Sequence, residues 1–191
     1  MTDLRQPGDF AVCPIAGPGG LAIGAAEGFA DVIARQMNFP AFTKWQHALV
    51  YVGGGRCLQA EPGGSRIVAR PVYPDDLWST GHITLPDAAR RLAAATAGRW
   101  EGIPYSALDY LALAAHRLHA PDWPVWAQNG HRVSLQQFIK DQGHEICSQL
   151  VDAFLMSCGV HLFADYRWPG YVMPIDLGHV IEGGAVPYTG S

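Results

Sequence analysis

The residue best placed for chemistry in this chain is Cys147, which opens a segment with the pattern of an amphipathic helix. Apolar residues recur there at helical spacing and predict one buried face, at Ile146, Leu150, Phe154 and Cys158. A helix N-terminus carries unpaired N–H groups and positive dipole, which lower the pKa of a nearby thiol. Because the thiolate is the nucleophilic form of cysteine, this position predicts a reactive Cys147.

A base for that thiol is offered by His47, much earlier in the chain. His47 opens an apolar run, 47–52, which three glycines end at 53–55, and the next run is 56–61. This pattern predicts two antiparallel strands joined by a tight turn. A histidine entering a buried strand and a cysteine entering a buried helix are the parts of a Cys–His nucleophilic site. His47 and Cys147 are therefore the candidate dyad.

A thiol hydrolase also needs a polar group that orients the imidazole. Gln59 and Glu61 follow His47 on the second strand of the predicted hairpin. They have the same parity along that strand, so both point to the same face of the sheet. Either could hold the ring.

Composition and charge narrow the classes of function. The 191 residues are 49% hydrophobic and 16% charged, which predicts one globular domain spanning 1–191. A net charge of −4 with scattered basic residues argues against a nucleic-acid partner. We expect no transmembrane segment, and the lack of a signal-peptide pattern makes the cytoplasm the default location. The four cysteines show no C-x-x-C spacing, so we expect free thiols.

We expect neither a metal nor a cofactor. His116 and His119 have the spacing of neighbours on a helix, but no cysteine or carboxylate nearby completes a metal site. The sequence also has no phosphate-binding loop and no dinucleotide fingerprint.

The order of the predicted elements indicates an α+β protein with an antiparallel sheet, because strands come mostly first and helices later. A further segment, 120–143, contains two tryptophans and no clear period, and is interpreted as an insertion that forms a lid or a substrate wall. The other predicted elements are a strand within 8–13, a helix at 21–36, a strand at 81–85, and helices at 87–97 and 104–118.

Six short motifs follow one another along the chain. They are Gly8-Asp9-Phe10, the histidine strand at 45–53, Gln59-Ala60-Glu61-Pro62-Gly63-Gly64, Gly102-Ile103-Pro104-Tyr105, Cys147-Ser148-Gln149-Leu150-Val151, and Pro174-Ile175-Asp176-Leu177. In this order the chain resembles the circularly permuted branch of the NlpC-type papain-like hydrolases. That branch contains the YaeF/YiiX amidases and the lecithin retinol acyltransferase-like proteins.

The resemblance implies a permuted papain-like fold, in which an antiparallel sheet carries the histidine and packs against a C-terminal helix that carries the catalytic cysteine. It places Gln59 at the orienting position, where glutamate is common in the family, and leaves Glu61 as the alternative. Tyr105 and Ser148 become candidate oxyanion or substrate contacts, beside the backbone N–H groups at the start of the cysteine helix.

The implied function is a cysteine hydrolase that cleaves an amide bond through an acyl-thioester intermediate. Its implied partner is a peptide or related amide substrate, with bacterial peptidoglycan as one candidate. A cell-wall target without an export signal would require delivery by phage lysis or by a secretion system. Two alternatives stay open: a thioesterase or acyltransferase acting on lipid-like substrates, and a catalytically weak scaffold used for binding. The oligomeric state is left open as well.

Overall fold

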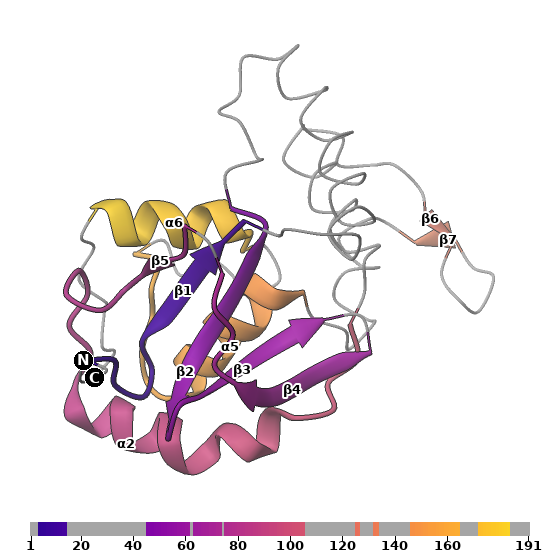
Figure 1. Cartoon of the computed structure of the whole chain (residues 1–191). Helices are drawn as coiled ribbons and strands as arrows, with labels where there is room; N and C mark the ends of the chain where they lie inside the picture. Colours follow the sequence, from indigo (N-terminus) through magenta and orange to yellow (C-terminus); the bar gives the residue numbers. More distant parts are fainter. Residues whose placement is uncertain are drawn as a thin grey trace.

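The computed structural model describes residues 4–14, 45–61, 63–73, 75–105, 125–126, 132–133, 146–164 and 172–183. A five-stranded antiparallel sheet with the order β4-β3-β2-β1-β5 is its centre (Figure 1). The strands are β1 (Phe10–Cys13), β2 (His47–Gly53), β3 (Arg56–Glu61), β4 (Gly64–Ala69) and β5 (Leu77–Trp78). The predicted α+β class with an antiparallel sheet is confirmed, and β2 and β3 form the predicted hairpin.

The described helices pack against one face of this sheet (Figure 1). α5 lies against β2 and β3, and α6 lies against β1. The helices are α2 (Asp87–Thr96), which continues into the 3-10 helix η1 (Ala97–Trp100), α5 (Cys147–Ser157) and α6 (Pro174–Gly183). The predicted apolar stripe of the cysteine helix is confirmed, because all four of its residues are buried in this core.

The alternation of side chains along the strands creates two apolar clusters, one on each face of the sheet. The main core faces the helices and takes from the strands Phe10, Val12, Ala48, Val50, Val52, Leu58 and Ala60. The cluster on the opposite face contains Ala11, Cys13, Leu49, Tyr51, Cys57 and Trp78. His47 and Gln59 have the parity of this second cluster.

Two elements near the ends of the fold differ from the sequence prediction. The segment 81–85 is not a strand, because the N–H groups of His82 and Ile83 both donate to the carbonyl of Ser79 and form a turn. The two apolar residues of this segment, Ile83 and Leu85, alternate with polar ones because both are buried in the main core. The last helix, α6, was not predicted; Asp176 accepts the N–H of Met173 at 2.8 Å and so caps its first turn.

Several predictions fall outside the described residues. The helix at 21–36 lies there entirely, and the helix at 104–118 does so beyond Tyr105. Within the insertion at 120–143, the structure describes one antiparallel pair, β6 (Val125–Trp126) with β7 (Arg132–Val133). In the described part of the chain, no helix combines the length and apolarity needed to cross a membrane.

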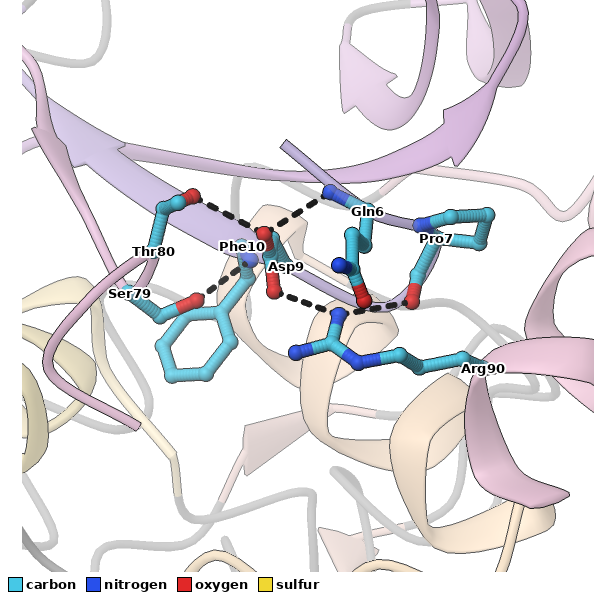
Figure 2. A network of polar contacts seen from close by, with 7 residues as sticks. All are labelled: Gln6, Pro7, Asp9, Phe10, Ser79, Thr80 and Arg90. Carbon is cyan, nitrogen blue, oxygen red and sulfur yellow. Dashed lines mark hydrogen bonds and ion pairs between the residues drawn. The ribbon is translucent and has the colours of Figure 1, made fainter. Parts of the chain in front are cut away.

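A buried ion pair fixes the start of β1 (Figure 2). The carboxylate of Asp9 accepts from Arg90 on α2 at 2.7 Å, from Thr80 Oγ1 at 2.9 Å and from the N–H of Gln6 at 2.9 Å. Gly8 before it has a φ of +92°, a conformation that favours glycine. The Gly-Asp-aromatic motif is thus explained by structure: it ties β1 to α2.

Trp45, which leads into the histidine strand, packs directly on α6. A Cβ added to Gly178 would lie 2.3 Å from Trp45 Cδ1, so one of the two must move. We expect Gly178→Ala to lower the free energy of unfolding by about 1–3 kcal/mol, the usual cost of overpacking a core. Gly183→Ala in the same helix is the matched control, since no atom lies within 4 Å of its added Cβ. Chemical denaturation measures both, and equal stabilities for the two variants would contradict the prediction.

Candidate active site

Three elements bring their ends together at the candidate dyad. His47 is the first residue of β2 and stands opposite Cys13, the last residue of β1. Cys147 is the first residue of α5. Its side chain lies close enough to the imidazole of His47 to raise the pKa of that ring. The two residues proposed from their positions in the sequence therefore meet in the structure, from elements far apart in the chain.

The local structure at Cys147 is that of a helix N-terminus. Ile146 has extended backbone angles and is the N-cap. Its N–H donates to the side chain of Gln149 at 2.9 Å, and the first helical hydrogen bond runs from Leu150 to Ile146. The N–H groups of the first turn have no acceptor within the helix itself. The sulfur of Cys147 thus lies at the positive end of the α5 dipole.

The two candidate orienting residues, Gln59 and Glu61, form a chain of contacts that ends at the His47 ring. Oε1 of Gln59 lies 3.3 Å from Nε2 of His47. Nε2 of Gln59 donates to Oε1 of Glu61 at 2.8 Å, and the other carboxylate oxygen of Glu61 pairs with Arg66 on β4. Gln59 is therefore the residue in contact with the ring, and Glu61 contacts Gln59.

Tyr73 completes the surroundings of the imidazole and was missed from the sequence. Its ring meets the His47 ring edge to face, with 5.8 Å between the centroids. Its hydroxyl lies 3.5 Å from Oε1 of Gln59. Burial, followed by the nearby Cys13, Glu61 and Cys147, raises the pKa of Tyr73 to about 12. The hydroxyl thus stays protonated as a donor. Tyr73 lies between β4 and β5 in no recognisable motif, so no signal in the sequence marks it.

The electrostatics favour a charged imidazole despite its burial. Burial is the largest single influence and lowers the pKa of His47. The charge of Cys147, hydrogen bonds with Cys147 and Gln59, and the charge of Glu61 act in the opposite direction and prevail, so the pKa of His47 is raised. The arrangement can therefore hold a thiolate–imidazolium pair.

A second thiol lies beside this pair. The sulfur of Cys13 is 3.9 Å from the carbonyl oxygen of His47. Burial, together with the charge of Cys147, raises the pKa of Cys13 well above that of an ordinary thiol. Cys13 is thus an inert neighbour of the dyad at ordinary pH. All four cysteines are free thiols, as the sequence predicts.

The two predicted oxyanion contacts, Ser148 and Tyr105, lie in different surroundings. Ser148 is fully buried and its hydroxyl donates to the carbonyl of Val172 at 2.8 Å. A hydroxyl has one hydrogen to donate, so the group that Ser148 can still offer an oxyanion is its backbone N–H. Tyr105 is half-buried against the main core. Its role as a donor stays a prediction.

Two of the motifs meet in space although the sequence separates them. Ser65, which follows the Gln59-to-Gly64 motif, exchanges backbone hydrogen bonds of 2.8 Å with Gly102 and Ile103. A Cβ on Gly64 would lie 3.0 Å from the carbonyl oxygen of Ile103, and the φ of Gly64 is +106°, so the position favours glycine. The contact covers part of the β4 edge and fixes the strand next to the one that carries Gln59.

The described residues contain no group of three or more His, Cys, Asp or Glu side chains arranged to hold a metal ion. His116 and His119 lie outside them. Comparisons of the chain with protein-family models, with curated proteins and with solved structures found no match.

Proposed function

We propose that the protein is a cysteine hydrolase with Cys147 as nucleophile, His47 as acid and base, and Gln59 as the orienting group. The observation that carries the proposal is the buried chain of contacts from Cys147 through His47 to Gln59 at a helix N-terminus. A thiol, an imidazole and a group that holds the imidazole are the components that thiol-dependent acyl transfer requires.

In this mechanism the thiolate of Cys147 attacks the carbonyl carbon of an amide. First-turn N–H groups of α5 stabilise the negative oxygen that forms, with Tyr105 as a candidate second donor. The C–N bond then breaks, and the leaving amine takes a proton from the His47 imidazolium. Neutral His47 next removes a proton from water, whose oxygen attacks the thioester. The acid is released and the thiol of Cys147 is restored.

The proposed substrates are peptides of the bacterial cell-wall type or related amides, which rests on the family resemblance of the six motifs. The alternative substrate is an acyl ester with an apolar chain. The same dyad would serve both chemistries, because only the leaving group differs.

The distinguishing experiment offers the protein purified peptidoglycan fragments, simple peptide amides and long-chain acyl esters in parallel. We expect new amino groups from an amide substrate, together with a covalent acyl adduct in the intact mass that hydroxylamine removes. Turnover of the esters alone would select the thioesterase or acyltransferase alternative. No product and no adduct with any substrate class would favour the binding scaffold.

A further inference from the structure

The two ends of the Gln59 amide have different partners. Its Nε2 lies 2.8 Å from Oε1 of Glu61, and its Oε1 faces Nε2 of His47 at 3.3 Å. An ionised carboxylate only accepts hydrogen bonds, so the NH2 end of the amide must face Glu61. The oxygen end is thereby turned toward the imidazole.

This orientation decides which ring nitrogen carries the hydrogen. An amide oxygen also only accepts, so Nε2 of His47 must be the protonated nitrogen. In the neutral ring Nδ1 is then the nitrogen that can take the thiol proton. With the amide reversed, its NH2 group would face Nε2 and require the hydrogen on Nδ1. That ring could no longer accept a proton at Nδ1.

Two further contacts accompany the observed orientation. The hydroxyl of Tyr73 lies 3.5 Å from Oε1 of Gln59 and can donate to it, but a hydroxyl also accepts, so it is the carboxylate of Glu61 that decides which end of the amide faces the ring. Arg66 pairs with the carboxylate oxygen of Glu61 that Gln59 does not use, and so holds Glu61 in place. The chain of contacts therefore runs from an exposed arginine to a buried imidazole.

Resting on the proposed function, we propose that Glu61 is a positioning residue: it fixes the amide of Gln59 and, through that amide, the tautomer of His47. The glutamine at the orienting position then works together with the carboxylate behind it. Glu61 keeps the ring in the form that can receive the thiol proton, although the contact with the ring belongs to Gln59.

Glu61 also acts on the ring through its charge. Among the residues that the structure describes, the titratable groups that face His47 are Cys147 from α5, Cys13 from β1, Glu61 from β3 and Tyr73 from the segment after β4. Of these, Cys147 and Glu61 raise the pKa of His47. Removal of Glu61 should therefore lower the pKa of His47 and bring the imidazolium to neutrality at lower pH.

The test is a pH titration of the protein by NMR with 15N-labelled histidine, which reports the tautomer and the pKa of His47 directly. We expect the parent to keep the hydrogen on Nε2. Glu61→Ala should give a mixture of tautomers and a lower pKa of His47, because the negative charge that favours the imidazolium is lost. Glu101→Gln is the control: it removes the charge of an exposed carboxylate that accepts the N–H of Ile67 on β4, and it should change neither the tautomer nor the pKa of His47.

A rescue separates positioning from a general structural effect. In the Glu61→Ala background, Gln59→Glu places a carboxylate directly on the ring and should restore the Nε2–H tautomer and the raised pKa. In an active parent, kcat should fall at least about tenfold in Glu61→Ala with little change in KM, and should recover in the double variant.

A parent-like tautomer and pKa in Glu61→Ala would overturn the proposal, as would a double variant that does not regain the Nε2–H form. These NMR results do not depend on turnover. A parent that hydrolyses nothing would count against the proposed function, whereas the tautomer would still test the role of Glu61.

Discussion

Cys147→Ala is expected to abolish hydrolysis, with a loss of roughly a thousandfold or more in kcat, because no other group in the dyad can form the thioester. The variant should still fold, because the substitution removes one sulfur at the N-terminus of α5 and leaves the apolar stripe from Ile146 to Cys158 intact. Initial rates on the active substrate class measure the first effect, and thermal unfolding measures the second.

The matched control is Cys158→Ala, at the other end of the same helix. Cys158 is also buried, and burial raises its pKa, so its thiol is unreactive. The Cys158→Ala variant should therefore keep the parental kcat. Cys13 is less suitable as a control because its sulfur lies against the backbone of His47. Full activity in Cys147→Ala, or its loss in Cys158→Ala alone, would remove Cys147 from the role of nucleophile.

Arg90→Ala should have the largest effect on stability. It would leave the carboxylate of Asp9 buried with two neutral donors and no counter-charge, because Asp9 is only 1% exposed. Removal of one partner from a buried ion pair lowers the free energy of unfolding by about 3 kcal/mol at the lower end of the usual range. We expect this lower value because the side chain of Arg90 is partly exposed. The unfolding midpoint should fall by about 10 °C.

Arg91→Ala is the control on the same helix. Arg91 is exposed, so its loss should change the free energy of unfolding by less than about 0.5 kcal/mol. The double variant Asp9→Ala/Arg90→Ala should cost less than the sum of its single changes, because no uncompensated charge is left. Strict additivity in denaturant unfolding would show that the two residues are not coupled.

The sequence alone predicted the elements that carry the site. Runs of apolar residues broken by glycine indicated β2 and β3, and the stripe from Ile146 to Cys158 indicated α5. These signals are local, because hydrophobic periodicity follows directly from burying one face of an element. The prediction of a strand at 81–85 is wrong because a local pattern does not identify the backbone that produces it. Ile83 and Leu85 are buried in the main core at the end of a turn and just after it, and their alternation is the same as that of a strand.

The position of Gln59 and Glu61 on one face also followed from strand parity, but their order of action did not. Parity gives the face on which a side chain lies and not its hydrogen-bond partner. Packing of β3 beside β2 and β4 decided that Gln59 contacts His47 and that Glu61 contacts Gln59 and Arg66.

Tyr73 and Cys13 became neighbours of His47 only in the tertiary structure. Neither belongs to a motif, and each comes from an element other than β2. The sequence by itself determined which residues could be a nucleophile and a base, because helix starts and strand starts are encoded locally. Their contact required the end of β1 and the starts of β2 and α5 to lie at the same place, and the long-range packing of the core decided that.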